Sequence, residues 1–250
     1  MKIATWNVNG IRAREAQVVE WIERDRPSVI CLQELKAPAE KVPASLCDLE
    51  GYWCYWHGTS AYSGVGLHLR KDEFPERPAF AHPAFDHETR IVTARAGNLL
   101  LASVYVPNGG KDFPAKLRFL EALEGFVRET RAQGLELVLC GDLNVARTDR
   151  DIHPKERRPV VGQLPEERAL LEKTLAAGLV DVGRALDPDN EELFTWWAPW
   201  RNMRQRNIGW RIDYILASPA LAAGAAACRV LAAFGTSDHA AVVAEFQSPP

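Results

Sequence analysis

The 250-residue chain is long enough for one large domain or two small ones. Its hydrophobic content of 47% and charged content of 25% exclude a mainly disordered protein. The net charge of −3 excludes a general polycation, so any surface that binds nucleic acid must be locally positive. No apolar run approaches the roughly 18 residues that a bilayer span needs, so we expect no membrane partner.

Nine short apolar runs predict β-strands, because they are bounded and rich in β-branched and aromatic residues. They span residues 2–8, 27–33, 52–57, 64–70, 90–96, 99–106, 135–141, 211–218 and 239–246. Helical spacing of apolar residues predicts helices over 15–24, 114–131 and 166–177. The chain has neither a linker nor an internal repeat, so residues 1–250 are predicted to form a single domain. The number and order of these elements favour an α/β sandwich of two stacked sheets with helices outside.

Cysteine usage favours a reducing compartment. The five cysteines include no CxxC pair, and Cys31 and Cys140 lie inside apolar runs, where a thiol acts as a small hydrophobe. We therefore expect neither a disulfide framework nor a structural zinc site, and a cytoplasmic location. The polar residues from Asn7 onward also argue against a cleavable secretory signal.

Acidic and amide side chains and one histidine stand where several predicted strands begin or end. The set comprises Asn7, Asn9, Glu34, Asp142, Asn144, Asp238 and His239. Turn residues are common after strands, but Glu is a poor turn former, and Asp before His ahead of a hydrophobic strand is unusual. Oxygen donors without a thiolate suit Mg²⁺ or Mn²⁺ better than zinc. The set therefore predicts a metal-dependent site that acts on a phosphoryl group.

Within this set, Asp142 can orient or deprotonate an attacking water, while Asn144 and His239 can donate to phosphate oxygens. His239 needs an acceptor to orient it, and Asp213 is the natural candidate. Asp213 interrupts the apolar run 211–218, where an unpaired charge is costly. An outward-facing position on an alternating strand accounts for Asp213 equally well.

The stretch 194–212 interleaves aromatic and basic side chains and contains no acid. It holds Trp196, Trp197, Trp200, Trp210, Arg201, Arg204, Arg206 and Arg211. Guanidinium groups pair with phosphates and indoles stack on sugars or bases, so the stretch predicts a loop that faces a polyanion. The alternative is a loop whose tryptophans pack on the core while its arginines are solvated.

Other charged residues carry less information. The basic residues between positions 147 and 158 are mixed with acids, which is typical of an exposed loop. Five of the six histidines have no partner that the sequence identifies, and we interpret them as incidental: His57, His68, His82, His87 and His153.

The ordered motifs W-N-V-N-G-I-R, I-C-L-Q-E, Y-S-G-V-G, Y-V-P-N-G-G, G-D-L-N-V-A, G-W-R-I-D-Y and S-D-H resemble the exonuclease III family of abasic-site endonucleases. That family lies within the DNase I-like phosphoesterase superfamily, and the resemblance runs from Met1 to about Phe246. It implies a four-layer α/β sandwich with two mixed β-sheets face to face. It also implies a metal-dependent DNA repair phosphodiesterase that cleaves 5′ to abasic sites, with 3′→5′ exonuclease and 3′-end-processing activity.

The resemblance also implies ligands and partners. The cofactor would be one or two Mg²⁺ ions, with Mn²⁺ as a substitute. The substrate would be double-stranded DNA with abasic sites or 3′ blocking groups, bound by a monomer. Glu34 would be the main metal ligand, helped by Asn7 or Asn9 and by Asp238. Whether Asp142, Asn144 and His239 hold a second ion is left open.

The same resemblance assigns the remaining roles. Asp142 would activate the water, with Asn144 beside it. His239, paired with Asp213, would contact the phosphate across from the metal, and Tyr105 would lie near it as a phenol donor or a phenolate. The DNA-facing positions would be the pocket residues Trp196, Trp210 and Ile212 and the outer contacts Arg12, Tyr62, Asn108 and Lys111.

Three positions depart from the best-known family patterns. Asn9 stands where some members carry Asp, which predicts weaker metal binding. Trp196 replaces a Phe, which predicts a narrower pocket, and Lys111 replaces an Arg that one branch inserts into the DNA helix. Two other functions remain open: a non-catalytic nucleic-acid-binding regulator, which the retained acids argue against, and a lipid or inositol phosphatase, which the tryptophan- and arginine-rich stretch disfavours.

Overall fold

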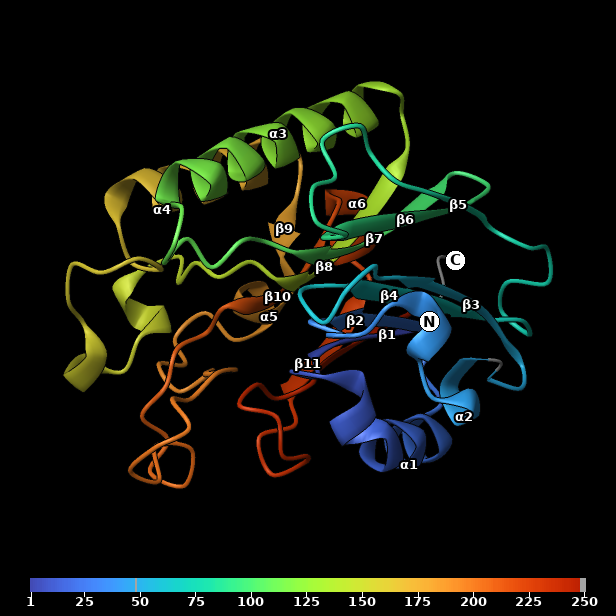
Figure 1. Cartoon of the computed structure of the whole chain (residues 1–250). Coiled ribbons are helices and arrows are strands. Elements are labelled where there is room, and N and C mark those ends of the chain that lie inside the picture. The colour runs from blue at the N-terminus through green and yellow to red at the C-terminus, as the bar shows by residue number, and fades with distance from the viewer. Residues whose placement is uncertain (48, 248–250) are drawn as a thin grey trace.

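Two six-stranded β-sheets stack face to face in the computed structural model, which describes residues 1–47 and 49–247 (Figure 1). The first sheet has the order β11-β12-β1-β2-β4-β3. Its strands are β1 (Lys2–Asn7), β2 (Val29–Gln33), β3 (Tyr52–His57), β4 (Val65–Arg70), β11 (Ala225–Val230) and β12 (Val242–Phe246). The second sheet has the order β5-β6-β7-β8-β10-β9. Its strands are β5 (Ala79–Ala81), β6 (Ile91–Ala96), β7 (Leu99–Tyr105), β8 (Glu136–Asp142), β9 (Val180–Asp181) and β10 (Asp213–Ala217).

Both sheets are mixed, because β1 pairs in parallel with β2 and β7 with β8, while the other pairs are antiparallel. Alternate residues of the facing strands form the core between the sheets, which includes Cys31 and Cys140, each about 1% exposed. Cys31 and Cys140 are therefore buried in the core, as their positions inside apolar runs predicted.

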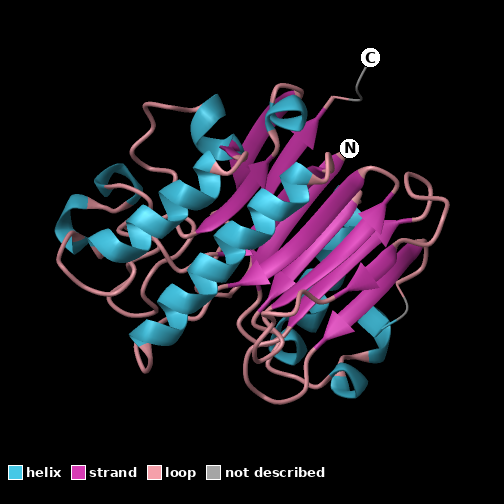
Figure 2. Cartoon of the chain, turned by 90° about the horizontal axis from the view of Figure 1, so that it is seen from above, coloured by secondary structure: helices cyan, strands magenta, loops and turns pink. Residues whose placement is uncertain are grey.

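Helices cover the outer face of each sheet (Figures 1 and 2). Helices α1 (Glu15–Asp25) and α2 (Ala44–Cys47) pack on the first sheet, and α3 (Phe113–Ala132) and α4 (Pro165–Ala176) on the second. Shorter helices are α5 (Val182–Leu186) and α6 (Pro219–Ala222), with 3-10 turns η1 (Ile11–Arg14), η2 (Ala39–Lys41), η3 (Asp149–Asp151) and η4 (Pro154–Glu156). No helix within the described ranges is both long and apolar enough to cross a bilayer.

The longest helix, α3, shows how local sequence sets these elements. The Asp112 side chain caps its first turn by accepting the Ala115 backbone N–H at 2.8 Å, and Pro114 lies in that turn, where its missing N–H costs nothing. Leu120, Leu123 and Val127 then recur at helical spacing and are buried against the sheet.

The predicted α/β sandwich is confirmed, and all nine predicted strands and three long helices are present. The last strand begins at Val242, not at residue 239, which leaves His239 in the preceding loop. The sequence patterns missed β5, β9 and β11. The first two have only three and two residues, and β11 is rich in alanine, which favours helices over strands.

Strand register brings the predicted acids to one edge. Asp142 stands opposite Asp213 in the antiparallel β8–β10 pair and beside Tyr105 in the parallel β7–β8 pair. In the first sheet, Asn7 ends β1 beside Gln33, the residue that precedes Glu34. Residues from both sheets therefore converge at these strand ends.

A buried histidine lies on the outer face of the first sheet. The His68 side chain is fully buried against Trp56, with ring centroids 4.3 Å apart, and neither ring nitrogen hydrogen-bonds another described residue. Burial lowers the pKa of His68 to about 3, because the imidazolium would lose its hydration. His68 thus stays neutral in the folded protein over a pH range in which it is protonated in the unfolded chain.

This difference predicts that His68 weakens the fold in acid. Below its unfolded pKa of about 6.5, the unfolded chain gains a proton that the folded protein does not, so stability falls by about 1.4 kcal/mol per pH unit. We expect urea unfolding at pH 7.5 and 4.5 to show that the free energy of unfolding falls by roughly 2–3 kcal/mol less in His68→Leu than in the parent protein. The exposed His87→Leu is the control and should follow the parent; identical losses in all three proteins would contradict the assignment.

Candidate active site

A cleft of about 350 Å³ opens at the strand ends where the two sheets meet. It is lined by Asn9, Glu34, Tyr105, Asn108, Asp142, Asn144, Val161, Gly162, Trp196, Trp210, Ile212, Asp238 and His239. Segments from the beginning, middle and end of the chain therefore share one cavity, and most of the sequence-predicted site residues lie in it. Glu34 and His239, which are more than 200 positions apart, both line the cavity.

The acidic flank of the cleft holds a cationic side chain. Lys36 Nζ lies 2.9 Å from Glu34 Oε1 and donates to Asn9 Oδ1 at 2.6 Å. Both Glu34 and Lys36 have left-handed backbone conformations, with φ of 56° and 51°, which non-glycine residues adopt only when the surroundings hold them there. The Lys36 ammonium group therefore places a positive charge between the Glu34 and Asn9 side-chain oxygens. The same two oxygens could bind a metal cation.

Asp238 completes this flank. Its Oδ1 accepts from Asn9 Nδ2 at 2.7 Å, and its Oδ2 accepts from the Trp196 indole N–H at 3.0 Å. Burial alone would raise the pKa of Asp238, but the neighbouring His239 and these two hydrogen bonds lower it below the ordinary value. Asp238 is therefore held as a carboxylate beside Asn9.

The opposite flank carries an oriented imidazole. His239 Nδ1 lies 2.9 Å from Asp213 Oδ2, which also accepts from Thr195 Oγ1 at 2.6 Å. Asp213 is buried, which settles the choice left open by the sequence in favour of a paired carboxylate. Burial opposes protonation, but the carboxylates of Asp213 and Asp142 outweigh it and raise the pKa of His239 to about 10. The imidazole is thus a cationic donor at neutral pH.

Asp142 lies between the two flanks. Its Oδ2 is 3.8 Å from His239 Nε2 and accepts from Asn7 Nδ2 at 2.8 Å, while its Oδ1 accepts from the Asn144 backbone N–H at 2.9 Å. Burial raises the pKa of Asp142 to about 7. A carboxylate that exchanges its proton near neutral pH has the property required of a general base. Asp142, Asp213 and His239 also present ligand atoms within 4.8 Å of one another, so this group could hold a metal ion.

Asn7 lies behind the cleft and does not line it. Its amide nitrogen donates to Asp142 and its Oδ1 accepts from the Asn9 backbone N–H at 3.0 Å. Because Asn7 ends β1 of the first sheet and Asp142 ends β8 of the second, this contact ties the two sheets together at the site.

Tyr105 and Asn144 contribute polar groups to the wall. Burial and the nearby Glu34 carboxylate raise the pKa of Tyr105, so its hydroxyl remains a phenol. The Asn144 amide nitrogen donates to the Val106 carbonyl at 2.9 Å, and its Oδ1 accepts from Asn108 at 3.4 Å. Both the nitrogen and the oxygen of the Asn144 side-chain amide therefore already form hydrogen bonds within the protein.

Two tryptophans and an isoleucine form the apolar wall. Trp196 and Trp210 meet edge to face with centroids 5.5 Å apart, and Ile212 packs in the same cluster. Gly162, which the sequence did not single out, allows this packing: its φ is +97°, and a Cβ there would lie 2.6 Å from the Trp210 ring. The adjacent Val161 also lines the cleft.

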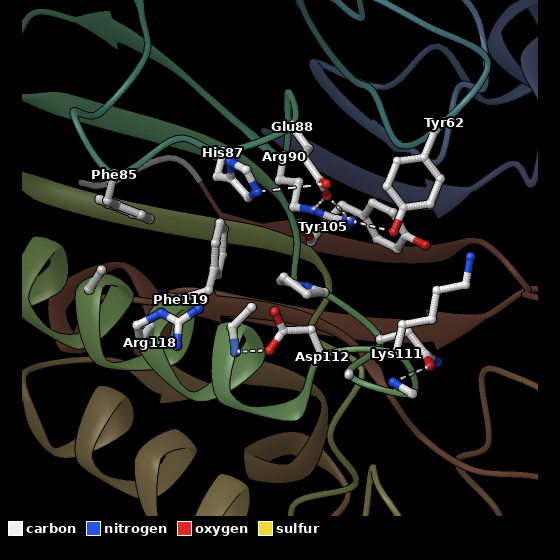
Figure 3. Close-up of a pocket in the computed structure, with 16 residues that line it drawn as sticks. Tyr62, Phe85, His87, Glu88, Arg90, Tyr105, Lys111, Asp112, Arg118 and Phe119 are labelled. Atoms are coloured by element: carbon white, nitrogen blue, oxygen red, sulfur yellow. Dashed lines mark hydrogen bonds and ion pairs between the residues drawn. The ribbon is translucent and has the colours of Figure 1, made fainter.

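A second cavity of about 920 Å³ adjoins the cleft and shares Tyr105 and Asn108 with it (Figure 3). Tyr62 and Lys111 line this groove and approach it from different segments. Buried Arg90 donates to the Tyr62 hydroxyl at 2.9 Å, and its guanidinium lies 4.9 Å from the Tyr105 ring centroid. Arg90 thus holds two of the predicted site tyrosines, a role that the sequence did not reveal.

Arg12 is exposed on η1 and lines neither of these two cavities. The structure therefore does not bring it together with the other predicted DNA contacts.

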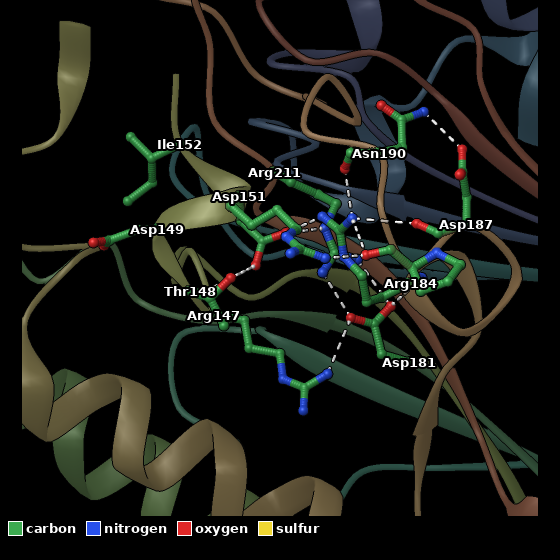
Figure 4. Close-up of polar contacts among 12 residues, drawn as sticks. Arg147, Thr148, Asp149, Asp151, Ile152, Asp181, Arg184, Asp187, Asn190 and Arg211 are labelled. Carbon is green, nitrogen blue, oxygen red and sulfur yellow. Dashed lines mark hydrogen bonds and ion pairs between the residues drawn. The ribbon is translucent and has the colours of Figure 1, made fainter. Parts of the chain in front are cut away.

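The prediction that the stretch 194–212 faces a polyanion is wrong for part of it. Arg211 is buried and pairs with Asp151 at 2.7 Å and with both oxygens of Asp181 (Figure 4). The Arg204 guanidinium donates to backbone carbonyls of residues 232, 234 and 237, and Trp197 is in the core. The acids that neutralise Arg211 come from distant segments, which a local absence of acid could not reveal.

The remaining members of that stretch divide between two surfaces. Trp196 and Trp210 line the cleft, whereas Trp200, Arg201 and Arg206 are exposed. Only these three side chains of the stretch present the exposed aromatic and basic surface that composition predicted.

Comparison with known proteins places this fold and cleft in a family. Residues 4–239 match the model of the endonuclease/exonuclease/phosphatase family. The chain is 33% identical to the Bacillus subtilis exodeoxyribonuclease over 97% of this chain and 98% of that protein. It is also 33% identical to the zebrafish (Danio rerio) DNA repair nuclease APEX1, over 96% of this chain and 80% of that protein.

Solved structures agree with these sequence comparisons. The 3′ phosphatase NExo from Neisseria, solved with a product DNA hairpin, superposes with a TM-score of 0.90 at 34% identity, covering 99% of this chain and all of that one. An AP endonuclease from Archaeoglobus fulgidus gives a TM-score of 0.89 at 29% identity over the same shares of the two chains. The chain therefore belongs to the endonuclease/exonuclease/phosphatase family, among its exodeoxyribonuclease III-type DNA repair nucleases.

Proposed function

We propose that the cleft hydrolyses the backbone of duplex DNA on the 5′ side of abasic sites, and that it also removes nucleotides and blocking groups from 3′ ends. The observation that carries this proposal is the arrangement of opposite charges across one small cavity. Glu34 and Asp238 line one flank and the cationic His239 lines the other, with Asp142 between them. A phosphodiester that enters the cavity would meet all of these groups at once.

The acidic flank fits a divalent cation. Glu34 and Asp238 would hold it together with the Asn9 side-chain oxygen, and Lys36 now provides the positive charge at that point. An all-oxygen set favours Mg²⁺, for which Mn²⁺ can substitute. When bound, the ion supplies Lewis-acid stabilisation of charge on the phosphoryl oxygens. Asn9 in place of an acid leaves this set with one negative charge fewer, so we expect a need for more Mg²⁺. The spacing of Asp142, Asp213 and His239 would also admit a second ion, but that ion would require a neutral imidazole and so would exclude the role of protonated His239 as a donor.

The chain's own groups have distinct tasks. Asp142, with a pKa near 7, would accept a proton from the attacking water. Protonated His239 would donate from Nε2 to a phosphate oxygen, held in place by Asp213. Tyr105 would donate a second hydrogen bond as a phenol. Asn144 would act mainly by orienting Asp142 and Asn108, because both ends of its amide already contact protein.

The shape of the cleft supports a baseless nucleotide as the substrate. Trp196, Trp210 and Ile212 form an apolar wall in a cavity of about 350 Å³, which suits a sugar without its base. A cavity of this size would select against a nucleotide that still carries its base. Extrusion of a nucleotide from the duplex also costs least where no base pair has to be broken. The duplex on either side would lie along the adjoining groove, in contact with Tyr62, Asn108 and Lys111, and Arg12 would meet the backbone farther out.

The test is product mapping on a duplex with a single synthetic abasic site. We expect one nick on the 5′ side of the site with Mg²⁺, no cleavage with a chelator, and slow shortening of 3′ ends. Binding without cleavage at any Mg²⁺ concentration would favour a nucleic-acid-binding regulator. Release of phosphate from inositol phosphates, with abasic DNA left intact, would favour the phosphatase alternative.

We further propose that the whole chain works as one catalytic domain, as a monomer in the cytoplasm.

A further inference from the structure

Two histidines and an aspartate meet where the edge strands of the two sheets lie close together. His57 ends β3 of the first sheet, His82 directly follows β5 of the second, and Asp86 lies four residues farther on. The two imidazole rings stack with centroids 3.8 Å apart, and His57 Nε2 is 2.6 Å from Asp86 Oδ2. Each of the three side chains presents a ligand atom within 4.8 Å of the other two.

Neighbouring groups hold two of the three side chains in place. Asp86 Oδ1 accepts the backbone N–H groups of Arg90 and Ile91 at 2.8 and 3.1 Å, which leaves Oδ2 directed at His57. The Tyr55 hydroxyl lies 2.8 Å from His82 Nε2. Metal-binding side chains in proteins commonly have such outer hydrogen bonds, which fix the orientation of each ligand.

The exposure of the cluster also suits a metal ion. His82 is exposed, while His57 and Asp86 are half-buried. Water can therefore occupy a remaining coordination position.

We propose that His57, His82 and Asp86 bind a transition-metal ion, with Zn²⁺ the best match, at a site separate from the acidic cleft. Two imidazole nitrogens and one carboxylate oxygen form a donor set that zinc accepts in four-coordinate geometry with water as the fourth ligand. Mg²⁺ prefers oxygen ligands, so it does not compete well for this set. The cysteines gave no indication of this site, because His57 ends a strand of one sheet and His82 follows a strand of the other.

The ion would act as a clasp. It would join β3 of the first sheet to the segment 82–90, whose Glu88 and Arg90 side chains pair at 2.8 Å and whose Arg90 holds Tyr62. Because an ion bound only by the folded protein shifts the equilibrium toward that state, zinc is expected to raise the melting temperature. At a hundredfold excess over its dissociation constant the rise should be roughly 5–10 °C.

Equilibrium dialysis of the full chain against Zn²⁺ tests this site by difference. The parent protein and His87→Ala should each bind one more zinc ion than His82→Ala, since His87 lies in the same exposed segment but outside the cluster. His82→Ala should also lose most of the zinc-dependent rise in melting temperature. The acidic cleft is intact in all three proteins, so zinc bound there cancels from the comparison.

Asp86→Asn provides a second test, because it keeps the Oδ1 acceptor for the two backbone N–H groups and removes the ligand charge. We expect it to weaken zinc binding at least tenfold. Equal zinc stoichiometry in the parent and His82→Ala, or an unchanged zinc affinity in Asp86→Asn, would overturn the proposal. So would an equal loss in His87→Ala, because that would show unspecific binding by surface histidines.

Discussion

His239→Ala and Asp142→Asn are each expected to lower the turnover of abasic-site cleavage by a factor of roughly 10²–10⁴, while binding of the duplex survives. His239 is held by Asp213 at 2.9 Å and carries a positive charge at neutral pH, so its removal deletes the donor opposite the acidic flank. Asp142→Asn keeps the shape of the side chain and the contact to the Asn144 backbone, but the amide cannot accept a proton from water.

Single-turnover cleavage of a labelled abasic duplex measures the rate, and fluorescence anisotropy measures binding in the presence of chelator. His153→Ala is the matched control for His239, because His153 lies outside both cavities, and it should retain the parent rate. Rates within a factor of three of the parent for both active-site variants would refute the assigned roles. Loss of duplex binding in step with turnover would assign the two residues to DNA binding.

Lys116→Met is expected to destabilise the fold by about 3–5 kcal/mol, because it leaves a carboxylate uncompensated in the interior. Lys116 Nζ and Glu167 Oε2 are 2.5 Å apart, and both side chains are fully buried. The ammonium also donates to the Asn144 carbonyl at 2.7 Å, and Glu167 Oε1 accepts the backbone N–H of Leu164 at 2.9 Å and that of Gly162. The ion pair therefore supports two loops that line the cleft.

Urea unfolding at pH 7.5 measures this loss. The double variant Lys116→Met with Glu167→Gln should be more stable than Lys116→Met alone, since the amide keeps an acceptor for the two backbone N–H groups without burying a charge. Lys173→Met, at an exposed position of the same helix as Glu167, should change stability by less than about 0.5 kcal/mol. If Lys116→Met were as stable as the parent protein, the Lys116–Glu167 ion pair would be dispensable for the fold.

Much of the fold was predictable because strand and helix patterns are local. The runs that became β1, β2, β4, β7 and β8 each combine β-branched residues with clear boundaries, and the spacing of Leu120, Leu123 and Val127 defines α3. The alanine-rich β11 was not predictable in this way. It is a strand because β12 pairs with it along its length, and this long-range pairing outweighs the helical preference of alanine.

The site was predictable where acids stand at strand ends and where motifs resemble a known family, as for Glu34, Asp142 and Asp238. It was not predictable where function depends on contacts between distant segments. No sequence pattern marks Lys36, whose ammonium group lies between Glu34 and Asn9. Arg211 seemed free to face DNA because its partners Asp151 and Asp181 lie 60 and 30 positions away.

The pairing of β1 with β12 makes the cleft depend on contacts between very distant segments. Lys2 stands opposite Glu245 and Thr5 opposite Val242, so β1 acquires one of its two neighbours from a strand more than 230 positions along the chain. The loop that precedes β12 carries Asp238 and His239. A fragment that stops before this loop therefore lacks both a neighbour for β1 and two residues of the cleft, and we expect it not to form the site.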